Sequence, residues 1–131
     1  MAKNKILFVD DERTIVILVK NRLKKNGYEV ITAGDGEEAL EKCRSNKPDL
    51  AILDINMPKI NGFQLCRLLR EDEKLKDIPI IVLSAFVRDK VGENSAVADV
   101  YIRKPFEPED LLGAIKRLLE TEGPIPRGKI S

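Results

Sequence analysis

Residues 50–54, Leu-Ala-Ile-Leu-Asp, form a short apolar run that stops at a carboxylate. Pro48 lies just before the run and Pro58 shortly after it. A continuous apolar run of this length between turn signals is typical of a strand buried on both faces of a parallel sheet. The aspartate would then lie at the carboxyl edge of the sheet, where open α/β folds place their binding sites. Asp54 is therefore the leading candidate for a functional residue.

Four further apolar runs resemble this one, and amphipathic segments separate them. The predicted strands are residues 5–9, 28–33, 50–54, 79–84 and 100–102. The predicted helices are residues 15–23, 37–44, 63–69 and 108–119, with only weak helical periodicity at 86–99. In the first helix we expect Ile15, Leu18, Val19 and Leu23 to face the core, and Asn26-Gly27 to end the helix. The alternation predicts an α/β fold, a doubly wound parallel sheet of five strands of the flavodoxin-like class.

Length and composition limit the kind of protein. A chain of 131 residues suits one domain, placed at residues 4–121, with a tail or linker at residues 122–131. The 23 basic and 22 acidic residues nearly balance, which argues against a general electrostatic hold on nucleic acid or membranes. No apolar run approaches the ~20 residues that span a bilayer, so a cytoplasmic protein is expected. Cys43 and Cys66 share no metal-ligand spacing and are expected to be reduced core residues.

The chain contains no histidine. This absence excludes a Ser-His-Asp triad, a histidine-ligated zinc site and a histidine general base. It also means that the chain carries no phosphohistidine of its own. Any chemistry must therefore use Asp, Glu, Lys, Ser or Thr side chains.

The ends of the first, third, fourth and fifth strands would share one edge of such a sheet. That edge gathers Asp10, Asp11, Asp54, Ser84 and Lys104. Three converging carboxylates repel one another unless a cation lies among them, and Mg²⁺ is a hard ion that prefers oxygen ligands. A carboxylate can also attack phosphorus to form an aspartyl phosphate, which needs charge neutralisation more than covalent help. Taken singly, the acidic pair has the simpler interpretation of a helix cap, and Lys104 that of a surface lysine.

The sequence resembles the receiver domain of two-component response regulators and is similar to the single-domain chemotaxis regulators. The matching motifs are Ile-Leu-Phe-Val-Asp-Asp-Glu at 6–12, Gly-Tyr at 27–28, Ala-Gly-Asp-Gly at 33–36, Pro-Asp at 48–49, Met-Pro at 57–58, Gly62, Ile-Pro-Ile-Ile-Val-Leu-Ser-Ala at 78–85 and Tyr-Ile-Arg-Lys-Pro-Phe at 101–106. The resemblance covers about residues 4–120 and implies the strand order 2-1-3-4-5. It also implies a signalling protein that catalyses only its own slow phosphorylation and dephosphorylation.

The same resemblance assigns the phosphoryl and metal chemistry. Asp54 would accept a phosphoryl group from a sensor histidine kinase or a histidine phosphotransfer protein. Asp11, Asp54 and the main-chain carbonyl of Asn56 would bind Mg²⁺, and Asp10 would assist, partly through water. No direct contact with nucleic acid or membrane is expected of this domain.

The resemblance also implies a switch between two conformations. Lys104 contacts the phosphoryl group, Ser84 moves toward it, and Tyr101 then swings inward as an aromatic switch. These contacts would shift a pre-existing equilibrium and so regulate an output. The Lys104–Pro105 peptide bond is expected to be cis, and homodimer formation on phosphorylation is left open.

Some positions depart from the family pattern or flank the site. The stretch between Ser84 and Tyr101 is shorter than usual, and Val-Ala-Asp-Val replaces Gly-Ala-Asp-Asp at residues 97–100, so a short, shifted or frayed fourth helix is expected. Phe86 is expected to screen the phosphoryl group from water. Val16 and Ile17 either widen the core contact of the first helix or form a kinase docking surface.

Other functions remain as alternatives. A Mg²⁺-dependent phosphohydrolase of the haloacid dehalogenase type also uses a strand-end aspartate, but it wants a second aspartate where this chain has Asn56. An interaction module that is never phosphorylated would not need the complete polar set. A flavodoxin-like cofactor binder is disfavoured, because residues 10–12 are acidic and would repel a phosphate.

Overall fold

The computed structural model of the chain describes residues 4–55, 59–84, 98–120 and 129–130. Its strands are β1 (Lys5–Val9), β2 (Glu29–Ala33), β3 (Leu50–Asp54), β4 (Ile80–Ser84), β5 (Val100–Arg103) and β6 (Lys129–Ile130). Its helices are α1 (Arg13–Lys25), α2 (Gly36–Asn46), α3 (Gly62–Glu71) and α5 (Pro108–Glu120). The segment for which a fourth helix was expected lies almost wholly outside the described residues.

The strands form one parallel sheet in the order β2-β1-β3-β4-β5-β6. The predicted order 2-1-3-4-5 is therefore confirmed, and one strand is added to it. This addition comes from the stretch expected to be a tail: Lys129 pairs with Val100, and Ile130 pairs with Tyr101. The sequence pattern did not predict β6. A strand of two residues forms because the edge of β5 offers hydrogen-bonding partners, not because its own residues strongly favour a strand.

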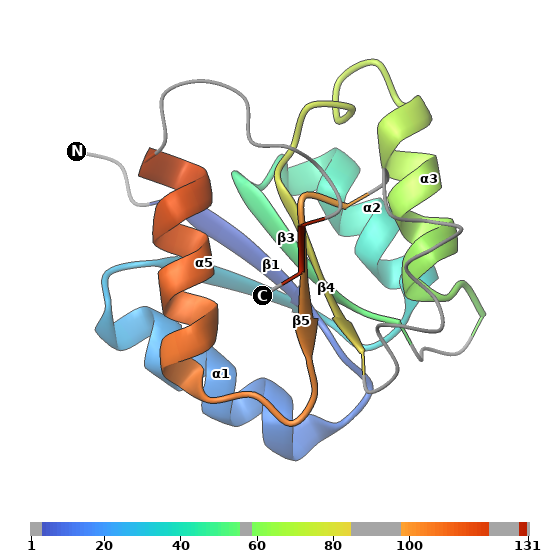
Figure 1. Ribbon diagram of the computed structural model, residues 1–131. Helices are drawn as coiled ribbons and strands as arrows, with labels where there is room; N and C mark the ends of the chain where they lie inside the picture. Colours follow the sequence, from blue (N-terminus) through green and yellow to red (C-terminus); the bar gives the residue numbers. More distant parts are fainter. Residues whose placement is uncertain (1–3, 56–58, 85–97, 121–128, 131) are drawn as a thin grey trace.

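Helices cover both faces of the sheet. Figure 1 shows α1 and α5 on one side and α2 and α3 on the other. Every residue of β3 and β4 is buried, which is why their sequences are continuous apolar runs rather than alternating ones. The two apolar clusters meet at these strands, so the end of β3 is held from both faces.

Local signals set the ends of the helices. The Asp35 side chain accepts a hydrogen bond from the Glu38 N–H and begins α2. Asn61 and Gln64 form a reciprocal capping box at the start of α3. Gly27 has φ +90°, a left-handed conformation that glycine adopts without strain, and it follows the end of α1 as predicted.

One predicted core residue of α1 is wrong. Val19 and Leu23 are buried and Ile15 is half-buried, but Leu18 is 65% exposed. Val16 packs on the core instead, while Ile17 is 57% exposed. Residues 15–19 are all apolar and surround the helix completely, so the periodicity did not indicate which side would be covered.

The remaining general expectations concern the cysteines and membranes. Cys43 and Cys66 are buried and free, as expected, and burial raises the pKa of each thiol to about 12. Such thiols are protonated and unreactive at neutral pH. Among the helices of the described residues, none has the length and apolar character needed to cross a membrane.

Candidate functional site

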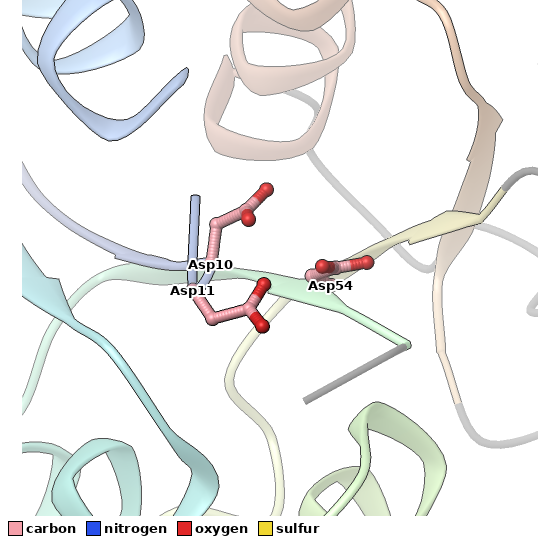
Figure 2. Close-up of side chains that lie close together, drawn as sticks. All are labelled: Asp10, Asp11 and Asp54. Carbon is pink, nitrogen blue, oxygen red and sulfur yellow. The ribbon is translucent and has the colours of Figure 1, made fainter. Parts of the chain in front are cut away.

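Three carboxylates converge at the carboxyl edge of the sheet. Asp10 and Asp11 follow the last residue of β1, and Asp54 ends β3 (Figure 2). Each offers an oxygen atom, and these oxygens lie within 4.8 Å of one another. Asp10 and Asp54 are buried at 1% and 3% exposure, whereas Asp11 is exposed. Because β1 and β3 are neighbours in the sheet, the predicted convergence is confirmed.

Lys104 reaches the same point from the end of β5. Its Nζ lies 3.3 Å from Oδ2 of Asp10 and 3.2 Å from Oδ1 of Asp54. Burial alone would lower the pKa of the Lys104 ammonium, but the charges of Asp10 and Asp54 outweigh it, and the net shift is upward. The amine is therefore held as a cation between the two buried carboxylates, and it is not a surface lysine.

Asp10 has a structural role as well as a place in the cluster. Its Oδ1 accepts a hydrogen bond of 2.9 Å from the Glu12 N–H, just before α1 begins. Its main-chain N–H donates to the Ala33 carbonyl at 3.2 Å, which extends the pairing of β1 with β2. The N-cap of α1 is Glu12, which makes no side-chain capping hydrogen bond, so the simpler interpretation of the acidic pair as a helix cap is wrong. The hydrogen bond from Glu12 instead holds the Asp10 carboxylate in the cluster.

Ser84 lies at the same edge of the sheet. It ends β4, is 2% exposed, and its carbonyl accepts a hydrogen bond from the Lys104 N–H at 2.9 Å. In the register of the sheet, Asp54 is opposite Leu83 and Ser84 is opposite Arg103. The backbone thus places Ser84 one strand away from Asp54. The Lys104–Pro105 bond directly after this point is cis, as expected.

Tyr101 is fully buried in the middle of β5, opposite Val82. Its ring centroid is 6.2 Å from that of Phe63, and burial is the main cause that raises its pKa to about 12. The ring therefore occupies an inward position, and its movement between two positions stays a prediction. Asn56 and Phe86 lie outside the described residues.

The cluster is suited to a divalent cation. Three carboxylates and one ammonium group meet in the cluster, so these four side chains together carry two more negative than positive charges. Asp10 and Asp54 are buried and Asp11 is exposed. All the available ligands are oxygen atoms, which favours a hard ion such as Mg²⁺ over the soft metals that prefer thiolate or imidazole. A cleft of about 580 Å³ opens beside Asp10 and Asp11 and gives the site access to solvent.

A feature that the sequence did not predict lies next to the site. An apolar groove of about 390 Å³ runs between α1 and the segment after β5. Its lining residues are Ile15, Leu18, Val19, Lys104, Pro105, Phe106 and Pro108. The exposed Leu18 therefore belongs to a groove that reaches the site lysine. The unbroken apolar stretch at residues 15–19 was the available signal for this surface.

Comparison with known proteins supports one family. A family model described as the response regulator receiver domain matches residues 6–116. The chain is 44% identical over 117 residues to the alkaline phosphatase synthesis transcriptional regulatory protein PhoP of Bacillus subtilis, with 88% of this chain and 48% of the relative covered. It is 46% identical to the probable transcriptional regulator ycf27 of Cyanophora paradoxa, with 93% and 51% covered. The chain thus spans about half the length of the curated relatives it matches.

Solved structures match over nearly their whole length. The chemotaxis response regulator CheY4 of Vibrio cholerae has a TM-score of 0.83 and 37% identity, with 89% of this chain and 99% of the other covered. The receiver domain of the sensor histidine kinase PA1611 of Pseudomonas aeruginosa, which has a magnesium ion in its active site cleft, has a TM-score of 0.84 and 27% identity, with 92% and 100% covered. The chain belongs to the response regulator receiver domain family, whose members are signalling proteins of two-component systems rather than metabolic enzymes.

Proposed function

We propose that this domain accepts a phosphoryl group on Asp54. The observation that carries the proposal is the position of Asp54: its carboxylate is 3% exposed, 3.2 Å from the Lys104 ammonium and grouped with Asp10 and Asp11. A carboxylate oxygen can attack phosphorus directly, and a cation fixed beside it neutralises part of the negative charge of the phosphoryl group. A structural acid at a strand end would need none of the other three side chains.

A carboxylate oxygen of Asp54 attacks the phosphorus of a phosphohistidine, and a new O–P bond forms while the P–N bond breaks. The electron pair of that bond leaves with the imidazole nitrogen of the donor. The donor must be another protein or a small acyl phosphate, because this chain has no histidine. Lys104 neutralises part of the charge that spreads over the phosphoryl oxygens.

Mg²⁺ is proposed as the cation of the site. Asp10, Asp11 and Asp54 would hold it, together with the main-chain carbonyl of Asn56 that the family resemblance implies. When bound, the ion supplies positive charge to the phosphoryl oxygens and lowers the repulsion among the carboxylates. The excess of two negative charges in the cluster supports this assignment.

Ser84 and Tyr101 are proposed to relay the modification. Ser84 is buried at the carboxyl end of β4, where its hydroxyl would hydrogen-bond a phosphoryl oxygen. Tyr101 and Ser84 are linked through the pairing of β4 with β5. A phosphoryl group on Asp54 would favour one arrangement of these residues and so shift a pre-existing equilibrium.

The proposed docking surface for the kinase is on α1. Val16 is half-buried on the core, so the contact residues are Ile17 and Leu18, which are 57% and 65% exposed. Leu18 lines the apolar groove that also includes Lys104, and Ile17 lines the cleft beside Asp10 and Asp11. A helix of the donor that covers this surface would place its phosphohistidine near Asp54, because the groove and the site share that lysine. Homodimer formation, the regulated output and the cytoplasmic location stay predictions.

The phosphohydrolase alternative is disfavoured by the family to which the chain belongs. The remaining alternative is an interaction module that is never phosphorylated. Intact-mass measurement after incubation with acetyl phosphate and MgCl₂ distinguishes the two. We expect a gain of one phosphoryl mass in the parent and none in Asp54→Ala. An equal gain in Asp54→Ala would show that another residue is modified, and no gain in the parent would contradict the proposed function.

A further inference from the structure

The first residue of α2 packs against the connection between β3 and α3 with no room for a side chain. A Cβ atom on Gly36 would lie 2.5 Å from Cβ of Ile60 and even closer to the carbonyl oxygen of Ile60. Real Cβ atoms do not approach other atoms this closely, and the carbonyl oxygen belongs to the backbone. Any residue other than glycine at this position must therefore displace Ile60 or α2.

A second close approach lies between Gly62 and the end of β3. A Cβ atom on Gly62, the first residue of α3, would lie 2.6 Å from the carbonyl oxygen of Asp54 and 2.8 Å from Cα of Ile55. The Gly62 N–H also donates to the Ile55 carbonyl at 3.0 Å. The start of α3 is thus in backbone contact with the residue whose carboxylate we propose to be phosphorylated.

The two contacts act in series. Gly36 sets the position of Ile60, and Gly62, two residues later, touches the backbone of Asp54. A displacement of Ile60 would move the start of α3 with it, because the next residue, Asn61, is attached to α3. The Asn61 side chain accepts a hydrogen bond from the Gln64 N–H at 2.9 Å and so caps this helix. Both contacts include backbone atoms, the Ile60 carbonyl and the Asp54 carbonyl, which cannot move aside as the far end of a flexible side chain could.

Two ion pairs of Lys59 also link the β3–α3 connection to the beginning of α2. The Lys59 Nζ lies 3.6 Å from Asp35 and 3.7 Å from Glu37, the residues on either side of Gly36. Lys59 itself has φ +68°, a backbone conformation that non-glycine residues adopt uncommonly. The connection is therefore drawn toward the beginning of α2 by charge as well as by packing.

We infer that Gly36 and Gly62 are positioning residues, which set the distance between the Asp54 carboxylate and the carboxylates of Asp10 and Asp11. This inference rests on the proposed function, because it assigns the glycines a role in the Mg²⁺ site. The glycines do not touch the ion; they act through the backbone of Asp54. Residues that orient metal ligands in this indirect way typically change metal affinity about 10- to 100-fold when they are replaced.

The experiment measures binding of MgCl₂ by NMR titration of ¹⁵N-labelled protein, which does not depend on phosphorylation. For Gly36→Ala we expect Mg²⁺ affinity to fall about 10-fold or more, with shifted amide signals for Ile55 and Gly62. Gly34→Ala is the matched control, because its Cβ would meet only Glu38 Oε1 at 3.8 Å. Its Mg²⁺ affinity should stay within about twofold of the parent, as for an ordinary surface substitution.

Ala114→Gly is the control for a general loss of stability. It should destabilise α5, which lies on the face of the sheet opposite α2 and α3. Its Mg²⁺ affinity should equal that of the parent. The inference is overturned if Gly36→Ala binds Mg²⁺ like the parent, or if Ala114→Gly binds as weakly as Gly36→Ala. Should Gly36→Ala not fold, Ile60→Gly decides, because it removes the Cβ atom that faces Gly36 and so loosens the contact: a reduced affinity supports the inference and an unchanged one overturns it. A parent that binds no Mg²⁺ contradicts the proposed function itself, whatever the glycine variants do.

Discussion

The Arg70 guanidinium, near the end of α3, lies 2.9 Å from a carboxylate oxygen of Asp99, directly before β5. Both side chains are only 12% exposed. Arg70 also donates to the carbonyls of Lys76 and Ile78, and the same Asp99 oxygen accepts the Ile80 N–H at 2.8 Å. This pair therefore joins α3, the connection to β4 and the beginning of β5 at the end of the sheet opposite the carboxylates.

Replacement of Asp99 should be among the most destabilising changes of a charged residue. Asp99→Ala leaves the guanidinium without its carboxylate and the Ile80 N–H without its acceptor, so the free energy of unfolding should fall by about 3 kcal/mol. Asp99→Asn keeps an acceptor oxygen and should cost less. Urea denaturation measures both, with Asp77→Ala at an exposed position as the control. Equal midpoints for Asp99→Ala and Asp77→Ala would refute the prediction.

The carboxylate cluster should reduce stability when no divalent ion is present. Asp11→Asn removes one of three like charges without removing either ion pair of Lys104, so unfolding in Mg²⁺-free buffer should require about 1 kcal/mol more. Addition of MgCl₂ should then stabilise the parent and have a much smaller effect on the variant. Paired urea titrations with and without MgCl₂ test both statements. A variant less stable than the parent without Mg²⁺ would show that Asp11 is not repelled by its neighbours.

Tyr101 should make the fold sensitive to alkaline pH. Its pKa is raised from 10.0 to about 12, mainly by burial, so the unfolded chain releases its proton before the folded one does. The contribution is complete below pH 10 and is lost as pH rises toward 12, by at most about 1.4 kcal/mol per pH unit. Tyr101→Phe should show a shallower loss of stability over this window in urea titrations at several pH values. Parallel curves for the two proteins would mean that Tyr101 does not contribute.

The proposed docking surface predicts a defect that depends on the phosphoryl donor. Ile17→Ser and Leu18→Ser replace exposed side chains, so thermal stability should change little. Phosphorylation by acetyl phosphate should also be unaffected, because that donor does not use the surface of α1. Transfer from a phosphorylated histidine kinase should slow by tenfold or so, as expected when contact residues worth about 1.4 kcal/mol are lost. Equal slowing with both donors would show that the substitutions disturb the carboxylate site rather than kinase docking.

Much of the site followed from where apolar runs end. In a parallel sheet the carboxyl ends of the strands share an edge, so the polar residues at or just after the ends of the predicted strands 5–9, 50–54 and 100–102 had to meet there. Short continuous apolar runs between turn signals indicated the strands, and the strands were predicted within one or two residues of their observed bounds.

The sequence was less informative where a position depends on contacts far along the chain. Arg70 and Asp99 are 29 residues apart, and both residue types are usually exposed, so their burial as a pair had no local signal. The exposure of Leu18 depends on the rotational orientation of α1 about its own axis. Five consecutive apolar residues do not determine that orientation. The tight contact between Gly36 and Ile60 likewise exists only once α2 and the β3–α3 connection have packed together.

The ion pair between Lys104 and Asp10 joins residues 94 positions apart. A chain still emerging from the ribosome can therefore complete β1 and β3 and still lack the ammonium that neutralises Asp54. The phosphorylation that we propose for Asp54 therefore requires a chain that has been synthesised through β5 and folded, because Lys104 lies beside Asp54 and would supply part of the charge that neutralises the phosphoryl group. We expect truncated or locally opened copies to be poor acceptors, so that signalling is limited to intact protein.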